Sequence, residues 1–333
     1  MKYIPDTYEN KLDIKETEKA IKMVKDAFQT EFAKKLNLLR VSAPLFVPTD
    51  TGLNDNLSGH EKAVTFTITS LNDIKCEIVH SLAKWKRMAL YKYGLKHSEG
   101  LYTDMNAIRR QEQVLDNLHS VYVDQWDWEK VMLRTERNDE FLHSTVRDIY
   151  ATIYHVSKIV EEHYSLLKSF LPEEIHFVKA QDLEDEYPQL TPQEREQVVA
   201  KKYGAVFIQN IGCALKSGKK HDMRAPDYDD WKLNGDIIVW YPILEKAVEL
   251  SSMGIRVDES ALVEQLAISG IKKYTNYHKS ILNNEYPLTI GGGIGQSRLC
   301  LIMLQKAHIG EVQASIWDQE TNEECQNKGI TLL

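Results

Sequence analysis

The residues with the clearest chemical potential form a glycine-rich run near the C-terminus, Gly291-Gly292-Gly293-Ile294-Gly295-Gln296-Ser297-Arg298. The run follows a short apolar segment and precedes a second one, residues 299–304, which is typical of a buried helix. Glycine lets a ligand approach the backbone closely, and a helix N-terminus attracts phosphate through its free N–H groups and its dipole. Arg298 adds a planar cation. The pattern predicts a flat ring lying on the glycines, with a phosphate chain that reaches Arg298.

The run does not match the common nucleotide-binding motifs. A dinucleotide fingerprint would need glycine where this chain has Gln296 or Arg298. The nearest P-loop-like stretch begins at Gly212, but its spacing is one residue too long and Lys220 replaces the serine or threonine. If the chain binds ATP, it therefore uses a different scaffold. The spacing alone is equally consistent with a tight turn between a strand and a helix.

A second candidate site lies on a predicted strand in the middle of the chain. Because side chains alternate along a strand, Gln125 and Asp127 share one face with Val121 and Val123. A neighbouring amide and carboxylate can hold an ammonium group. A solvent-exposed strand end would show the same pattern.

Carboxylates also occur on two further predicted strands. Glu249 and Ser251 fall on one side of a strand that ends near Arg256, and Asp236 opens another strand. Two such carboxylates could share Mg²⁺, which prefers oxygen ligands, although a structural ion pair is the commoner arrangement.

Two charged clusters have ordinary explanations. The three aspartates in residues 227–230 usually indicate a solvated turn, but beside an arginine they could also contact a ribose or a metal. Lys84 and Arg87 share one face of a helix predicted over residues 81–93, with Ser81 as its N-cap. A basic helix face of this kind is normally solvated.

Hydrophobic spacing predicts the elements that must position these residues. Apolar residues recur every three or four positions in 21–36 and 142–160, which indicates amphipathic helices. A capping box with proline begins a further helix at Thr191. Strands are predicted at 64–68, 76–79, 101–108, 121–128, 205–208, 237–240 and 249–255. Because strands and helices do not alternate evenly, we expect an α+β fold around a mostly antiparallel sheet.

Composition restricts the class of protein. The chain has 333 residues, a formal net charge of −8 and four widely spaced cysteines. The charge disfavours sequence-independent nucleic-acid binding, and the cysteines fit a reducing compartment. The polar N-terminus is unlike a secretory signal, and no apolar run approaches the ~18 residues of a membrane span. We therefore expect a cytoplasmic protein with a single domain over 1–333, in which residues 1–15 form a flexible extension.

Taken together, these segments resemble one family, the ammonia-dependent asparagine synthetases (asparagine synthetase A, or aspartate–ammonia ligases). The resemblance covers nearly the whole chain. Its blocks are 55–59, 80–87, 100–103, 119–129, 221–231, 233–240, 249–257 and 289–299. The resemblance implies the catalytic-domain fold of class II aminoacyl-tRNA synthetases, an antiparallel sheet flanked by helices, and a homodimer whose interface motif contains Pro44.

The resemblance also implies a reaction: L-aspartate, ATP and ammonia give L-asparagine, AMP and pyrophosphate through β-aspartyl-adenylate, with Mg²⁺ as cofactor. Arg109 would hold the α-phosphate, and the hairpin 109–119 would cover ATP. The implied nucleotide-side positions are Arg109, Arg224, Asp229, Gly293, Gly295 and Arg298, and the implied metal ligands are Asp236 and Glu249.

For aspartate, the resemblance leads us to expect that Lys86 and Arg256 grip the α-carboxylate. Their pocket would be supported by serines, and three further residues would hold the α-amino group and the incoming ammonia. The serines are Ser81, Ser251 and Ser252, and the three residues are Asp55, Gln125 and Asp127. Asp55, Arg109, Gln125 and Arg298 are the residues expected to act in catalysis.

Two rival interpretations remain at this point. One is a class II synthetase fragment or a paralogue that adenylates another substrate, although the N-terminal barrel of aspartyl- and asparaginyl-tRNA synthetases is absent here. The other is a non-catalytic, synthetase-like regulator, which would be expected to lack the ATP arginines and acidic residues. A glutamine-dependent synthetase is excluded more firmly, since Cys76 is the first cysteine.

Overall fold

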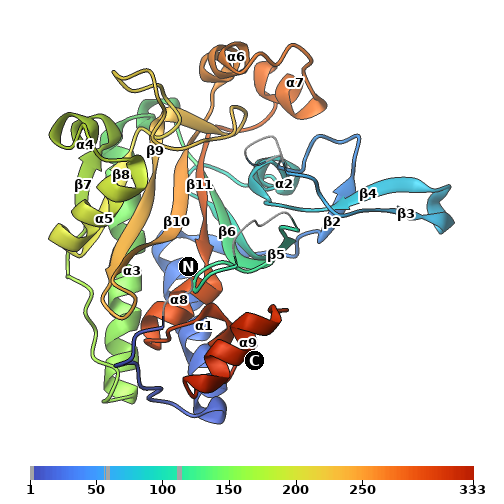
Figure 1. Ribbon diagram of the computed structural model, residues 1–333. Helices are drawn as coiled ribbons and strands as arrows, with labels where there is room; N and C mark the ends of the chain where they lie inside the picture. The colour runs from blue at the N-terminus through green and yellow to red at the C-terminus, as the bar shows by residue number, and fades with distance from the viewer. Residues whose placement is uncertain (1–3, 56, 58–60, 111–114) are drawn as a thin grey trace.

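The computed structural model describes residues 4–55, 57, 61–110 and 115–333. Its centre is an eight-stranded sheet with the order β1-β5-β6-β11-β10-β9-β8-β7 (Figure 1). Five neighbouring pairs are antiparallel, and only the outermost pairs, β1 with β5 and β7 with β8, are parallel. The expected mostly antiparallel α+β sheet is therefore confirmed. The strands of this sheet are β1 (Leu38–Arg40), β5 (Gly100–Ile108), β6 (Tyr122–Val131), β7 (His176–Lys179), β8 (Ala205–Gln209), β9 (Asp229–Tyr241), β10 (Lys246–Arg256) and β11 (Thr289–Gly295).

Helices flank the sheet and a small second sheet projects from it (Figure 1). The helices are α1 (Ile14–Leu36), α2 (Ala83–Tyr93), α3 (Asp139–His163), α4 (Ala180–Glu186), α5 (Pro192–Tyr203), α6 (Glu259–Ile268), α7 (Asn276–Leu282), α8 (Gln296–Met303) and α9 (Gln319–Asn327), with 3-10 turns η1 (Thr69–Leu71), η2 (Arg134–Glu136) and η3 (Ile309–Glu311). The projecting sheet has the order β2 (Phe46–Pro48), β4 (Ile74–Ile78) and β3 (Thr65–Ile68). No helix in the described ranges is both long and apolar enough to cross a bilayer.

Helix α1 covers one face of the central strand β6. The Phe28 ring lies 4.5 Å from the Trp126 ring, and the Phe32 ring lies 6.0 Å from the Trp128 ring. Both tryptophans are fully buried. Because side chains alternate, the adjacent residues Gln125 and Asp127 face the other side of the sheet, as the sequence pattern predicts.

The glycine-rich run lies inside strand β11 and does not form a turn before a helix. The strand extends to Gly295, pairing with β6 on one side and β10 on the other, and α8 begins at the next residue. The alternative of a strand–helix turn is therefore wrong. Arg298 lies in the first turn of α8, close to the open end of the strand.

The N-terminal segment differs from the flexible extension that the sequence suggested. Ile4 and Leu12 are buried, and the Tyr8 hydroxyl donates to the Glu311 carboxylate at 2.8 Å. The Lys306 ammonium donates to the side chain of Asn10 at 2.6 Å. Residues 4–13 thus pack against the C-terminal part of the chain. They contribute buried apolar side chains and hydrogen bonds to Glu311 and Lys306.

Candidate active site

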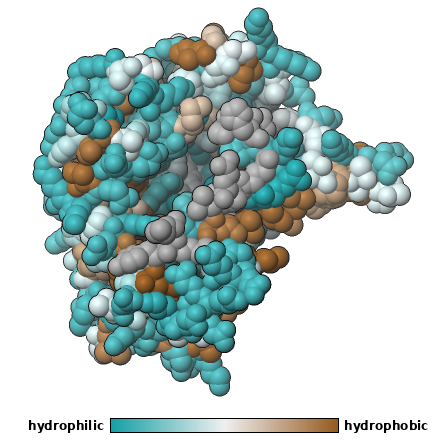
Figure 2. Space-filling model, viewed as in Figure 1, coloured by the Kyte–Doolittle hydropathy of each residue, from teal (hydrophilic) through white to brown (hydrophobic). Residues whose placement is uncertain are grey.

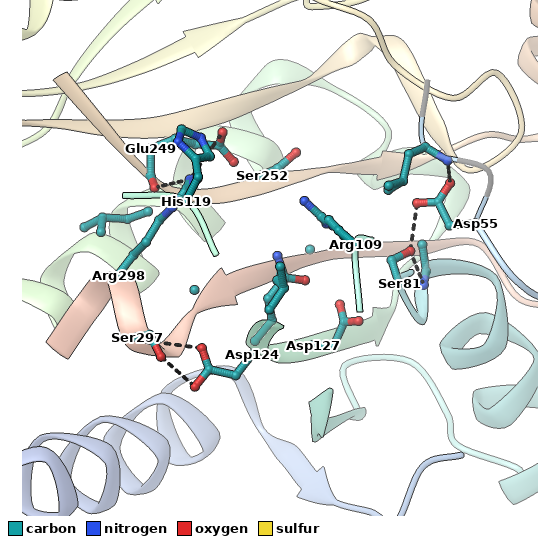
Figure 3. A pocket seen from close by; sticks show the side chains of 18 of the residues that line it. Asp55, Ser81, Arg109, His119, Asp124, Asp127, Glu249, Ser252, Ser297 and Arg298 are labelled. Carbon is teal, nitrogen blue, oxygen red and sulfur yellow. Dashed lines mark hydrogen bonds and ion pairs between the residues drawn. The ribbon is translucent and has the colours of Figure 1, made fainter. Parts of the chain in front are cut away.

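A cavity of about 320 Å³ opens on the face of the sheet opposite α1, above β6, β10 and β11. Figure 3 shows Arg298, His119 and Glu249 at one end of it, Asp55 and Ser81 at the other, and Arg109 and Asp127 between them. Most of the predicted site residues meet here. Those that line it are Asp55, Ser81, Lys86, Arg109, Gln125, Asp127, Arg224, Asp229, Glu249, Ser252, Arg256, Gly293, Gly295 and Arg298.

One part of the cavity floor is a dense, buried network of charges. The Lys86 ammonium pairs with the Asp127 carboxylate and donates to the Gly292 carbonyl at 2.9 Å. Arg256 donates to Glu129 through Nε at 3.0 Å and through Nη2 at 2.8 Å, and its Nη1 pairs with Asp229. We call these five side chains, Lys86, Asp127, Glu129, Asp229 and Arg256, the buried end.

Neighbouring charges favour the charged forms of Glu129 and Arg256 at the buried end. Burial prevails at two other groups, lowering the pKa of Lys86 and raising the pKa of Asp229. Burial opposes ionisation of Glu129, but the Arg256 guanidinium and the Lys86 ammonium outweigh it and hold the pKa of Glu129 below its usual range. Thr289 also donates to Glu129 at 2.6 Å. Charge-assisted hydrogen bonds of this kind fix side-chain positions tightly, so the floor is a preorganised surface.

The glycines of β11 make room for this network. A Cβ at Gly291 would overlap the Glu129 carboxylate, and a Cβ at Gly293 would lie 2.6 Å from Gln125 Oε1. The space above these two glycines is therefore filled by side chains of β6. The expected role of Gly293 as a bare platform for a ring needs revision, because Gln125 already lies against it.

The loop that carries Asp55 is held down by hydrogen bonds. The Ser81 hydroxyl donates to Asp55 Oδ2 at 2.8 Å, and His80 Nδ1 lies 3.1 Å from the Asp55 carbonyl. Asp55 is buried although it lines the cavity. The N-cap position of α2 is Leu82, one residue after the expected Ser81, but the Ser81 hydroxyl still accepts from the Ala83 N–H at 3.4 Å. The Leu82 N–H donates to Asp127 at 3.1 Å. Residues 56 and 58–60 of the predicted block 55–59 lie outside the described residues.

A β-bulge in β10 changes which serine faces the cavity. The pairing of β10 with β9 shifts between Glu249 and Ser251. Glu249 and Ser252 consequently face the cavity, whereas the Ser251 hydroxyl is buried on the other side and has no hydrogen-bond partner within the described part of the chain. The expectation that Ser251 binds substrate does not fit this geometry, because simple alternation from Glu249 ignores the extra residue.

The other part of the cavity is more exposed, and we call Arg109, His119, Glu249 and Arg298 the open end. Arg298 donates from Nη1 to the Glu249 carbonyl at 3.0 Å and lies 3.8 Å from its carboxylate. The Nε of Arg109 has no hydrogen-bond partner among the described residues. His119 Nδ1 lies 2.7 Å from the Asp116 carboxylate, which leaves the other ring nitrogen for the cavity. Residues 111–114 of the predicted hairpin lie outside the described residues.

The predicted metal pair is only partly available. Asp236 is not among the lining residues of the cavity, and both of its carboxylate oxygens accept from the Arg224 guanidinium. Burial, opposed by Arg224 and reinforced by Glu249, raises the pKa of Asp236 to about 8. In the described part of the chain, no three His, Cys, Asp or Glu side chains are grouped to hold a metal. The residues fit a magnesium ion bound by Glu249 and by oxygens of a phosphate ligand, which is how Mg²⁺ is often held.

Several residues at the site were not expected from the sequence. Glu129 continues the alternation of Gln125 and Asp127, so extending that pattern by two positions would have found it. Tyr228 lines the cavity, and its ring lies 5.6 Å from the Arg256 guanidinium. Of the two alternatives for the three aspartates in 227–230, the solvated turn is wrong, and the basic pair Lys84 and Arg87 is not solvated either, because all five side chains are buried.

Comparison with known proteins identifies the family. The family model described as aspartate–ammonia ligase matches residues 15–329. The chain belongs to the aspartate–ammonia ligase family. An aspartate–ammonia ligase of Clostridium tetani is 56% identical over 332 residues, covering 99% of this chain and 97% of the relative. One of Ruminiclostridium cellulolyticum is 57% identical over 331 residues, covering 99% and 98%.

Solved structures show the fold of this family member. The asparaginyl-tRNA synthetase of Pyrococcus horikoshii, complexed with asparaginyl-adenylate, matches with a TM-score of 0.63 at 14% identity over 92% of this chain and 70% of that chain. The aspartyl-tRNA synthetase of Entamoeba histolytica matches with a TM-score of 0.61 at 12% identity over 91% of this chain but only 58% of that longer chain. The fold is that of a class II aminoacyl-tRNA synthetase catalytic domain, as the resemblance implied.

Proposed function

We propose that this protein converts L-aspartate, ATP and ammonia into L-asparagine, AMP and pyrophosphate through a β-aspartyl-adenylate. The observation that carries the proposal is one cavity that joins a closed floor of paired cations and carboxylates to an open end with two arginines, Arg109 and Arg298. The relatives named aspartate–ammonia ligase and the synthetase complexed with asparaginyl-adenylate support the same chemistry.

Aspartate would bind at the buried end. Its α-carboxylate faces Lys86 and Arg256, each of which has N–H groups beyond those used in the ion pairs. Its α-amino group faces the carboxylates Asp55 and Asp127. This orientation leaves the β-carboxylate directed toward Arg109 and the phosphates, which is the selection that the reaction requires.

ATP would bind at the open end, with its phosphates between Arg109 and Arg298. The Nε of Arg109, which has no partner among residues 4–55, 57, 61–110 and 115–333, is a donor that a phosphate oxygen could accept from. When bound, Mg²⁺ would neutralise phosphate charge beside Glu249. We no longer include Asp236 as a direct ligand, because Arg224 occupies its oxygens.

The proposed reaction has two displacements. A β-carboxylate oxygen attacks the α-phosphorus, and pyrophosphate leaves. The nitrogen of ammonia then attacks the β-carbonyl carbon, AMP leaves, and the ammonium-derived proton is released to a carboxylate or to solvent. Arg109 and Arg298 would stabilise the charge that develops on the phosphates. Gln125 lines the cavity and is not needed for the α-amino group, so we assign the binding of ammonia to this residue.

A direct assay tests this function. Purified protein should consume aspartate, ATP and ammonium in the presence of Mg²⁺ and release asparagine, AMP and pyrophosphate in equal amounts. Formation of ADP and phosphate would contradict an adenylate, and turnover without ammonium would contradict the amidation step.

We also propose that the protein is a homodimer. The projecting sheet carries large apolar side chains that remain exposed in the single chain. They include Phe46 and Phe66, whose rings lie 5.0 Å apart. Figure 2 shows hydrophobic residues along the lower edge of this projection and toward the body. An exposed apolar surface of this kind favours a protein partner, and Pro44, at the base of the projection, belongs to the implied interface motif. Light scattering at micromolar concentration should give twice the 38.4 kDa chain mass, and a monomer would contradict the proposal.

A further inference from the structure

A buried charge cluster outside the cavity connects two of its walls to helix α7. The Lys84 ammonium lies 2.6 Å from Asp227 Oδ2, and His278 Nε2 lies 3.0 Å from the same oxygen. Lys84 belongs to α2, Asp227 to the segment that leads into β9, and His278 to α7. All three side chains are buried. Three elements far apart in the sequence therefore meet at one carboxylate oxygen.

The hydrogen bonds define the protonation state of His278. The Thr275 backbone N–H donates to His278 Nδ1 at 3.2 Å, so Nδ1 is the acceptor and the ring proton lies on Nε2. Nε2–H then donates to Asp227. Burial opposes the charge on Asp227, but Lys84 and His278 outweigh it and keep its pKa below the usual value. Asp227 is thus a carboxylate that accepts from two elements at once.

The cluster lies directly behind residues that face the cavity. Tyr228 and Asp229 follow Asp227, and Lys86 follows Lys84 by two positions; all three line the cavity. The loop that carries Asp55 rests on the same helix end, because a Cβ at Gly52 would lie 2.9 Å from Thr275 Cβ. Helix α2, the segment that leads into β9 and the loop that carries Asp55 are therefore all held by contacts with this cluster or with the start of α7.

We propose that Lys84, Asp227 and His278 are positioning residues for the aspartate subsite. They fix the distance between the cavity-lining residues of α2 and those at the start of β9. None of the three is among the described residues that line the cavity, so they act through Lys86, Tyr228 and Asp229. The inference rests on the proposed function, because it assigns aspartate to the buried end. A small displacement of one wall is sufficient to weaken substrate binding at a preorganised site.

Two substitutions of one histidine separate positioning from mere folding. In His278→Gln, the side-chain amide can reach the place of Nε2 and still donate to Asp227. In His278→Asn, the shorter side chain can accept from the Thr275 N–H in place of Nδ1 but cannot reach Asp227. We expect His278→Asn to raise the aspartate KM five- to twentyfold with the ATP KM within twofold, and His278→Gln to stay within threefold for both substrates.

The control is His143→Asn, since His143 bonds Gln209 outside the cavity, and it should leave both KM values unchanged. Equal aspartate KM values for the wild type and His278→Asn would overturn the inference. Equal impairment of both His278 variants, in parallel with a lowered Tm, would also overturn it by showing a purely structural role. If the wild type forms no asparagine or AMP, the proposed function itself fails; an active wild type with an unaffected His278→Asn refutes only the positioning role.

Discussion

The charged side chains at the two ends of the cavity differ in their burial and in their protein partners. At the buried end, the side chains of Lys86 and Glu129 are buried from solvent and each ion has a protein partner. At the open end, the Arg298 side chain is 26% exposed and that of Glu249 is 45% exposed, with only a long contact between their charges. Charges at the buried end are therefore held mainly by one another as part of the fold and leave only spare N–H groups for a ligand, whereas charges at the open end remain largely available to a ligand. Removing a charge should affect stability and activity together at the first end, but activity alone at the second.

The largest effect is expected from Glu129→Gln. This change leaves the buried Arg256 and Lys86 with less negative charge, and breaking a buried pair costs about 3–5 kcal/mol. Urea denaturation should show a lower midpoint, together with loss of asparagine formation. The matched control is Glu249→Gln at the open end, which should stay within about 0.5 kcal/mol of the wild type. Equal midpoints for the two variants would break the comparison.

The same residue predicts a pH dependence. Because the pKa of Glu129 is lowered in the folded state, its contribution to stability is fully present above its usual value of 4.5 and is lost as the pH falls through the lower folded pKa. The difference in unfolding free energy between the wild type and Glu129→Gln should thus be constant near neutrality and shrink in acid. A difference that grows as the pH falls would contradict the assigned ion pairs.

Arg298→Ala should abolish most activity without lowering stability. Arg298 is proposed to stabilise developing phosphate charge, a role typically worth about 2–4 kcal/mol, or roughly 30- to 1,000-fold in kcat/KM. Its long, exposed contact with Glu249 contributes little to the fold. Steady-state kinetics and thermal unfolding on the same sample test both halves. A loss of kcat/KM below fivefold would show that this arginine does not bind the phosphates.

Gly293→Ala should reduce both stability and activity, each by a moderate amount. The added methyl group would meet Gln125 Oε1 at 2.6 Å, so the Gln125 side chain must move. Overpacking of this kind costs about 1–3 kcal/mol, here divided between stability and substrate binding. Gly295→Ala is the control, because its methyl group would approach only the Arg298 side chain, at 3.3 Å. Identical kinetics for Gly293→Ala and the wild type would mean that the position of Gln125 is unimportant.

The sequence predicted local features at both ends but not their connections. Alternation placed Gln125 and Asp127 on one face, and the capping box at Thr191 correctly began α5. Alternation failed at Ser251, since a bulge depends on the neighbouring strand β9 and leaves no local signal. The family resemblance supplied Lys86, Asp127, Asp229 and Arg256, but it did not predict that Lys86 pairs with Asp127 or that Arg256 pairs with Glu129 and Asp229 from two other strands.

The sequence also failed to predict that some charged residues are buried. Lys84 and Asp227 look like surface residues by composition, because charged side chains are almost never fully buried unless they are paired. Each is buried only because the other, together with His278, supplies the opposite charge or a donor across the fold. Such pairing over 143 residues, between positions 84 and 227, is a property of tertiary structure, so a single sequence gives no spacing from which to infer it.

The smallest effect on stability, and the sharpest test of the comparison, is expected from Gln125→Glu when it is compared with Asp127→Asn. Gln125 is half-buried and faces the cavity, so a new negative charge should leave stability within about 0.5 kcal/mol. The charge should weaken binding of a dicarboxylate by roughly 1–2 kcal/mol, or five- to thirtyfold in aspartate KM. Asp127→Asn, two residues along the same strand face, removes the ionic partner of the fully buried Lys86 and should lower the unfolding midpoint as well. If both variants unfold alike, the boundary between fold and ligand site does not run between these two neighbours. If neither changes the aspartate KM, aspartate binds elsewhere in the cavity.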